Sequence, residues 1–194
     1  MYWQVYLHKT TLAAEQMLVN ILKRAKEIAV SDSNLFATPA FKQFLTNNFI
    51  EQDFTENPEI LPLFSQLDDY DIYASLKVWT NHEDVVLSRL CKGMVDRKIY
   101  KIRLQKDPFE IEKTAPYIDK IRSQYNLPEK DQHYFAFTGN ISNSAYNPNS
   151  EPIRILFRDG TQIELSLASD QLEVAVLSSP IQKNFFCCLP ELID

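Results

Sequence analysis

The stretch DRKIYKIRL, residues 96–104, decides how this chain folds, because the character of the sequence changes within it. Before it, apolar residues recur every three or four positions, which is typical of amphipathic helices. From Tyr100 to Leu104 apolar and polar residues alternate, which predicts a β-strand. We therefore expect an α+β protein with a mainly helical N-terminal part, residues 1–98, and a small antiparallel β-rich subdomain, residues 99–194.

The N-terminal part predicts a succession of helices. The first is expected at residues 2–29, where no Ser, Thr, Asp or Asn precedes it, so that it lacks an N-cap. An uncapped start is typical of a segment cut from a longer protein, and we expect such a cut here. Later helices are expected to begin at residues that favour helix N-termini, namely Thr38-Pro39, Pro58, Asp68-Asp69 and Asn81.

The C-terminal part predicts one more helix, residues 108–125, and then short β-strands. Asp159-Gly160 predicts a hairpin turn, because this dipeptide readily adopts positive φ. Residues 140–151 are rich in Asn, Ser and Pro and predict a loop. The strands are expected at residues 133–138, 153–157, 162–165, 172–177 and 185–188.

Composition and charge exclude several functional classes. The net charge is −6, and an acidic chain is a poor general binder of nucleic acid, so no nucleic-acid partner is expected. No apolar run approaches the length of a membrane span, and the N-terminus has no signal-peptide pattern. The three cysteines, Cys91, Cys187 and Cys188, form no CxxC motif and suggest neither a disulfide framework nor a zinc site. We expect a soluble, cytoplasmic protein.

Motifs for catalysis are missing from the sequence. It contains no His-Asp dipeptide, no HExxH, no GxSxG and no phosphate-binding glycine-rich loop. His8, His82 and His133 are widely scattered, whereas a catalytic metal needs several converging ligands. We interpret the acidic run at residues 68–71 as a helix N-cap rather than a magnesium site. No catalytic residue and no metal ligand are therefore expected.

Two stretches carry candidate binding residues. In the first, Tyr6 and His8 would point to nearly opposite sides of a helix that turns about 100° per residue, with Lys9 returning towards Tyr6. The alternative is a solvated first turn with a buried tyrosine. The second stretch, residues 97–103, holds four cations, and such a cluster suits a polyanion such as a triphosphate. The alternative is a solvated edge, or partners for the many acidic side chains.

Several of these stretches together resemble one enzyme family. VYLHKT (5–10) followed by AEQML (14–18) looks like the segment just after the catalytic core of HD-type dNTP triphosphohydrolases. LDDYD (67–71) and DRKIYK (96–101) match the same family in order and spacing. Downstream, YFAF (134–137) through Ala145-Tyr146, with ASDQL (168–172), resembles the phosphohydrolase-associated region of its bacterial members. The resemblance covers essentially the whole chain.

The resemblance implies roles for particular residues. In the YxHK motif of the family the tyrosine lies against the substrate sugar, and the His-Lys pair contacts an activating nucleotide at a subunit interface; these are Tyr6, His8 and Lys9 here. In the SAM-and-HD-domain dNTPase, an R-x-x-aromatic-K run approaches regulatory nucleotide phosphates, which gives Arg97 and Lys101. One position departs from that relative, since its basic residue two before the tyrosine is a glutamine here.

The resemblance also implies a function. The chain is expected to be the C-terminal accessory and oligomerisation part of an HD-superfamily nucleotide phosphohydrolase, inactive alone, with a regulatory nucleotide site. Its partners would be the HD core in the same chain, a nucleoside triphosphate and further copies of itself. The divalent metal of the parent enzyme, Mg²⁺ or Mn²⁺, would be held by that core, and no cofactor by this chain. The alternative is a stand-alone, non-enzymatic binding or scaffold module of the same architecture.

Overall fold

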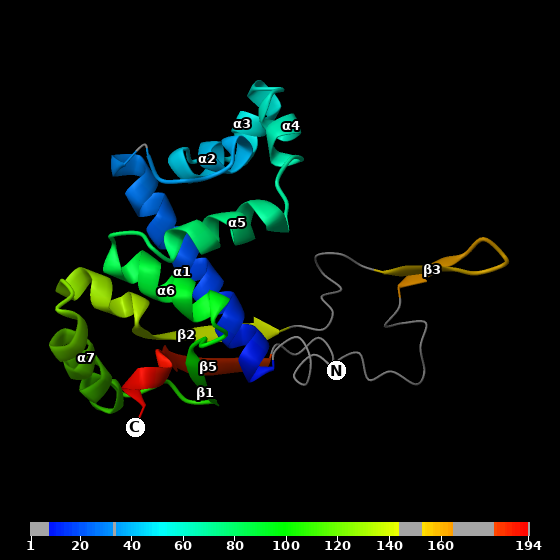
Figure 1. Cartoon of the computed structure of the whole chain (residues 1–194). Coiled ribbons are helices and arrows are strands. Elements are labelled where there is room, and N and C mark those ends of the chain that lie inside the picture. The colour runs from blue at the N-terminus through cyan, green and yellow to red at the C-terminus, as the bar shows by residue number, and fades with distance from the viewer. Residues whose placement is uncertain (1–7, 33, 144–152, 165–180, 194) are drawn as a thin grey trace. The chain divides into compact units, whose positions relative to one another are not determined.

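Figure 1 shows the computed structural model of the chain, which describes residues 8–32, 34–143, 153–164 and 181–193. The chain divides into two compact units. The first contains Met1–Arg103, Glu110–Phe137 and Phe186–Asp194, and the second contains Leu104–Phe109 and Thr138–Phe185. These bounds differ from the predicted parts, residues 1–98 and 99–194, and that division stays a prediction.

The first unit is built around one long helix. Helix α1 packs against α2 and α6, and α5 also packs against α6 (Figure 1). The residues of α1 that face this core recur at helical spacing and are fully buried, among them Met17, Ile21 and Ala25. No helix in the described ranges is both long and apolar enough to cross a membrane. The helices are α1 (Lys9–Ser31), α2 (Pro39–Thr46), α3 (Glu51–Glu56), α4 (Ile60–Phe64), α5 (Asp69–Trp79), α6 (Val85–Val95) and α7 (Ile111–Tyr125).

The start of α1 differs from the prediction. The helix begins at Lys9, and His8 is its N-cap with extended backbone angles of φ −62° and ψ 143°. The Nδ1 atom of His8 accepts a hydrogen bond from the backbone N–H of Thr10 at 3.3 Å. The predicted uncapped start is therefore wrong, because an imidazole nitrogen serves as the cap acceptor. The prediction that His8 lies on a helix face is also wrong, because His8 precedes the first helical residue and has an extended backbone.

Two other predicted helix starts are confirmed and two are wrong, since α4 begins at Ile60, with Glu59 as its N-cap, and not at Pro58. Thr38 precedes α2 with Pro39 in the first turn, as expected. Asp68 accepts hydrogen bonds from two backbone N–H groups at the start of α5, which confirms that the acidic run there is a cap. Asn81 does not cap α6; Asp84 does, through the N–H of Leu87 at 2.8 Å. The carboxylate of Asp84 is the cap because it directly precedes the helix, whereas the amide of Asn81 lies three residues earlier.

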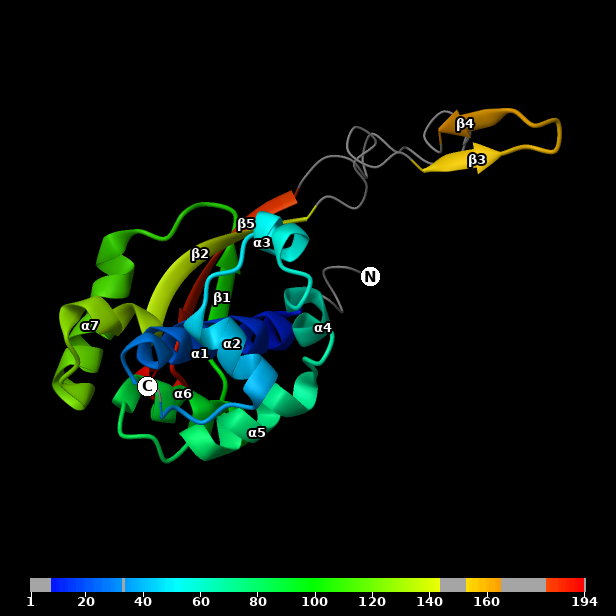
Figure 2. The same ribbon diagram turned by 90° about the horizontal axis from the view of Figure 1, so that it is seen from above.

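The β-strands form two small antiparallel sheets, which confirms the α+β class. One sheet has the order β1-β5-β2, with the strands side by side in Figure 2, and the other pairs β3 with β4. The hairpin aligns Ile155 with Ile163, and its turn has φ 86° at Gly160, as the Asp-Gly signal predicts. The strands are β1 (Lys101–Gln105), β2 (Ala136–Asn143), β3 (Arg154–Leu156), β4 (Gln162–Glu164) and β5 (Ile181–Cys188).

Two predictions for the C-terminal part need correction. The strand expected from His133 begins instead at Ala136, because the preceding residues form a 3-10 helix, η1 (Glu129–Tyr134). The loop expected from Asn140 is wrong for its first residues, since β2 continues to Asn143 despite its polar side chains. A second 3-10 helix, η2 (Pro190–Leu192), follows β5. The expected strand at residues 172–177 lies outside the described residues.

A partly buried charge cluster joins three elements of the first unit. The guanidinium of Arg24, in α1, donates two hydrogen bonds to Asp84 at 3.1 and 2.7 Å and another to Asp131, in η1, at 3.1 Å. The side chains of Arg24 and Asp131 are only 14% and 8% exposed. Burial disfavours the charge of Asp84, but hydrogen bonds from Arg24 and from the N–H of Leu87 outweigh it and hold the pKa of Asp84 below its usual value.

Replacing Arg24 is expected to destabilise the fold strongly. Arg24→Met would leave two partly buried carboxylates without their cation, at a cost of about 3 kcal/mol in the free energy of unfolding. Urea unfolding measures this loss. Arg122→Met is the matched control, because its pair with Asp119 is exposed and 3.7 Å long, and should change the stability by less than about 0.5 kcal/mol. Equal effects of both substitutions would contradict a structural role for the cluster.

The same cluster predicts how stability depends on pH. Because the pKa of Asp84 is lowered on folding, its contribution is fully present above the ordinary aspartate pKa of about 4 and is lost as the pH falls through the lower folded value. Asp84→Asn should therefore be less stable than the unchanged chain at pH 7. The difference should shrink at about pH 3, as measured by urea unfolding at both pH values. A difference that grows on acidification would contradict the assignment.

Candidate anion-binding site

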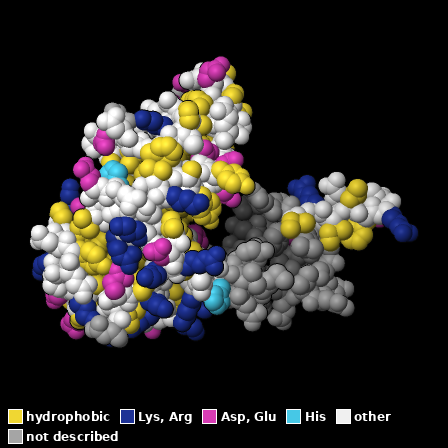
Figure 3. All heavy atoms as spheres, viewed as in Figure 1, with side chains coloured by type: hydrophobic (Ala, Val, Ile, Leu, Met, Phe, Trp, Pro, Cys, Tyr) yellow, Lys and Arg dark blue, Asp and Glu magenta, His cyan; other side chains and the backbone are white. Residues whose placement is uncertain are grey.

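A basic hollow lies in the first unit where the start of α1, the end of α6 and the start of β1 meet. Its volume is about 430 Å³. Four of its lining residues are Lys or Arg, and none is Asp or Glu. Figure 3 shows Lys and Arg side chains gathered around the region where α1 begins. We call this cavity the first hollow. Its lining residues are Lys9, Thr10, Ala13, Arg97, Lys98, Ile99, Tyr100, Lys101, Ile102 and Pro190.

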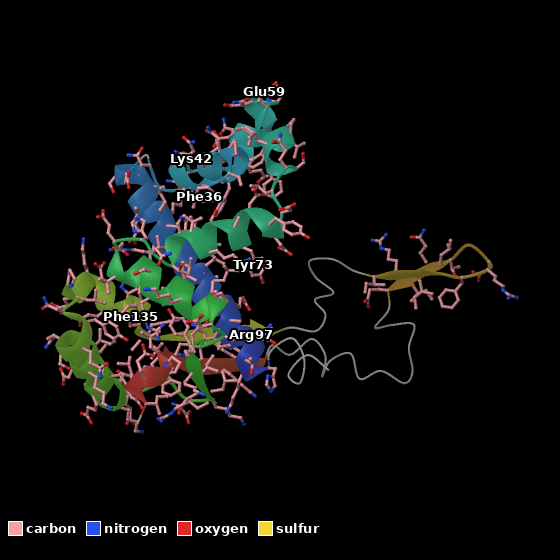
Figure 4. All side chains as sticks on the ribbon, viewed as in Figure 1. Phe36, Lys42, Glu59, Tyr73, Arg97 and Phe135 are labelled. Atoms are coloured by element: carbon pink, nitrogen blue, oxygen red, sulfur yellow. The ribbon has the colours of Figure 1, made fainter. Side chains whose placement is uncertain are left out.

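Three of the predicted site residues meet in this hollow. Lys9 is the first residue of α1, Arg97 follows α6, and Lys101 opens β1, yet all three line the same cavity. Figure 4 shows Arg97 close to the N-terminal end of α1. His8 does not line the hollow, because its ring caps the helix one residue before Lys9. Tyr6 lies outside the described residues.

The cations of the first hollow face solvent. Lys9, Arg97, Lys98 and Lys101 are all exposed. Within the part of the chain that the structure describes, none of the four makes an ion pair. The first turn of α1 carries no acidic residue, so the positive end of the helix dipole adds to their field. The hollow is thus suited to a compact, multiply charged anion.

The backbone of Arg97 explains how its side chain comes to line the hollow. Helix α6 ends in a Schellman motif, in which the N–H of Lys98 bonds the carbonyl of Gly93 at 2.8 Å and that of Arg97 bonds the carbonyl of Met94 at 3.3 Å. This motif places Arg97 in the left-handed region with φ 58°. Glycine is the usual residue there, because a Cβ atom in that conformation costs about 1 kcal/mol. The fold thus places an arginine where glycine is usual.

Sequence reasoning missed some of the lining residues. Lys98 belongs to the basic cluster but was not assigned a binding role, although it is adjacent to Arg97. Nothing in the sequence marks Thr10 as a binding residue, apart from its position in the first turn of a helix. Pro190 comes from the other end of the chain, and only the tertiary fold brings it to the hollow.

The other reactive side chains have structural roles. The ring nitrogen Nδ1 of His82 accepts the N–H of Asp84 at 3.0 Å, and that of His133 lies 2.6 Å from the carbonyl oxygen of Lys130. All three cysteines are buried, which raises the pKa of Cys91 and of Cys187 to about 12 and that of Cys188 to about 11. They are therefore neutral core residues, as expected, rather than nucleophiles.

The described residues do not fit a metal ion. Among them, no three His, Cys, Asp or Glu side chains come together as ligands. The metal expected for a parent enzyme thus has no site in the described part of this chain, and we assign no metal-dependent step to it. That the whole chain lacks a catalytic or metal site stays a prediction.

The chain is similar to proteins about twice its length. No family model matches it. A crystal structure of a phosphohydrolase from Bacteroides thetaiotaomicron is 41% identical and superimposes with a TM-score of 0.79, and the match covers 97% of this chain but 47% of that one. The uncharacterised protein YwfO of Bacillus subtilis is 29% identical over 180 residues, which cover 89% of this chain and 39% of YwfO. The chain is thus related in sequence and fold to part of a phosphohydrolase.

Arg97→Gly is expected to stabilise the protein. Glycine adopts the left-handed conformation without the Cβ penalty, so the free energy of unfolding should rise by about 1 kcal/mol. Chemical unfolding measures the change. Asn126→Gly is the matched control at the end of α7, where φ is 49°, and should give a smaller gain because asparagine tolerates this region. A loss of stability in Arg97→Gly would show that the arginine side chain supports the fold itself.

Proposed function

We propose that this chain is the accessory and regulatory part of an HD-type nucleotide phosphohydrolase, and that the first hollow binds the triphosphate group of a nucleotide. The observation that carries the proposal is the convergence of Lys9, Arg97 and Lys101 on one hollow without an acidic residue. The relation to a phosphohydrolase supports it, because enzymes that cleave phosphate esters need sites for phosphate groups.

The chemistry of the hollow favours a polyphosphate over a singly charged anion. Four cations within one hollow repel each other, and a ligand with several negative charges relieves that repulsion most. Arg97 offers a planar guanidinium that can bond two phosphate oxygens at once, while the lysines supply charge in flexible positions. The cavity of about 430 Å³ lies within the usual size range of small-molecule sites.

The proposal assigns the chemical step to another part of a longer protein. The chain spans less than half of the two longer relatives, and its described residues offer no metal site. In the proposed protein, an HD core in the same chain holds a divalent metal, Mg²⁺ or Mn²⁺, and hydrolyses the nucleotide. The present chain contributes to the oligomer and senses a nucleoside triphosphate. The isolated chain would then bind nucleotide without releasing triphosphate.

Calorimetric titration tests the binding part of the proposal. The 194-residue chain is titrated with dGTP and, separately, with inorganic tripolyphosphate. Lys101→Ala should weaken both interactions by about tenfold, since a charge-assisted hydrogen bond contributes about 1.5 kcal/mol. Lys92→Ala is the matched control, because this exposed lysine lies on α6 but does not line the hollow.

Two outcomes would overturn the proposal. Equal affinities of Lys101→Ala and Lys92→Ala would show that binding reflects net charge alone. Release of triphosphate from dGTP by the isolated chain with Mg²⁺ or Mn²⁺ would show that it carries a catalytic site of its own.

A further inference from the structure

A second basic hollow lies between β1, α7 and the C-terminal segment, within the same unit. Its volume is about 330 Å³. Three of its lining residues are Lys or Arg, none is acidic, and one is an aromatic residue. The basic patch predicted at residues 97–103 thus serves two cavities rather than one. The lining of this second hollow consists of Arg103, Lys113, Pro116, Tyr117, Lys120, Leu192 and Ile193.

Strand β1 supplies one cation to each hollow. Lys101 and Arg103 are both exposed and are separated by the half-buried Ile102, so they stand on the same face of the strand. Two residues along a strand span about 7 Å, so the two cations reach neighbouring sites. Within the described part of the chain, Arg103 makes no ion pair, and its guanidinium is available to an outside anion.

Helix α7 supplies the opposite wall. Lys113, Tyr117 and Lys120 recur at helical spacing and therefore share one face. The Tyr117 ring lies 4.9 Å from that of Phe186, which fixes its orientation. Lys113 forms an ion pair with Glu110 at 2.8 Å, but both side chains are about two-thirds exposed (69% and 66%), so the pair is weak in water.

The third wall is held in place by contacts of its own. Arg89 and Tyr125 both donate hydrogen bonds to Glu191 in η2, the former from Nε at 2.8 Å. The Arg89 cation thus offsets the charge of Glu191, the residue that precedes the lining residue Leu192. The ammonium of Lys120 donates to the carbonyl oxygen of Leu192 at 3.2 Å. The C-terminal wall of the hollow is therefore anchored at both Glu191 and Leu192.

We propose that the second hollow binds the phosphate group of a small phosphorylated compound, with its apolar or aromatic body against Tyr117. Arg103 provides the paired hydrogen bonds to phosphate, and the lysines of α7 provide further positive charge. A nucleoside monophosphate has the required chemistry, a single phosphate joined to a flat ring system. This inference goes beyond the regulatory triphosphate site and rests on different residues.

The test uses a chain in which the first hollow is weakened by the loss of the Arg97 guanidinium. In the Arg97→Gly background, calorimetric titration with AMP should still show binding at one site per chain. Adding Arg103→Gln should weaken AMP binding by at least about tenfold. Adding Arg122→Gln instead should change it less than about twofold, because this arginine lies on α7 outside the lining. Tyr117→Leu should weaken AMP but leave the affinity for inorganic phosphate unchanged.

The outcomes separate this inference from the proposed function. Absence of AMP binding in the Arg97→Gly background, or unchanged binding after Arg103→Gln, would overturn the second site. Neither result bears on the effect of Lys101→Ala on triphosphate binding, which tests the first hollow alone. Equal losses of AMP and inorganic phosphate in Tyr117→Leu would overturn the assignment of the ring to the body of the ligand.

Discussion

The contact between α1 and α6 is the constraint on which the rest of the first unit depends. At one end, Arg24 of α1 holds Asp84, the N-cap of α6, by two hydrogen bonds. At the other end, Lys9 and Arg97 line the first hollow. The helices thus run in opposite directions over similar lengths, about 22 Å from Lys9 to Arg24 and about 20 Å from Asp84 to Arg97 at 1.5 Å per residue.

Close packing makes this alignment possible. A Cβ atom on Gly93 of α6 would lie 3.2 Å from the Cε atom of Met17 in α1 and 3.1 Å from the carbonyl oxygen of Lys98. Glycine at that position therefore lets α6 approach α1 where the Schellman motif begins. The partly buried charge cluster fixes the distant end of the helix pair and the basic hollow forms at the near end, so the stability of the unit and the geometry of the hollow depend on one interface.

The sequence was informative where local chemistry decides the structure. The Thr38-Pro39 start, the Asp68 cap and the Asp-Gly turn are set by residues close to each other, and all were predicted. His8 was missed as a cap because imidazole is an uncommon cap acceptor. The partners of Arg24 could not be predicted, because Asp84 and Asp131 lie 60 and 107 residues away and only tertiary packing brings them together. Arg97 and Lys101 were predicted as binding residues from the resemblance to the family's R-x-x-aromatic-K run, but only the fold shows that they meet Lys9.

The central claim is that the start of α1 and the end of α6 together form a binding site for a triphosphate. A crystal structure of the chain grown with a non-hydrolysable dGTP analogue tests it most directly. The account predicts phosphate density within hydrogen-bonding distance of Lys9, Arg97 and Lys101. Triphosphate density bound elsewhere on the chain, with that hollow filled by water alone, would contradict it.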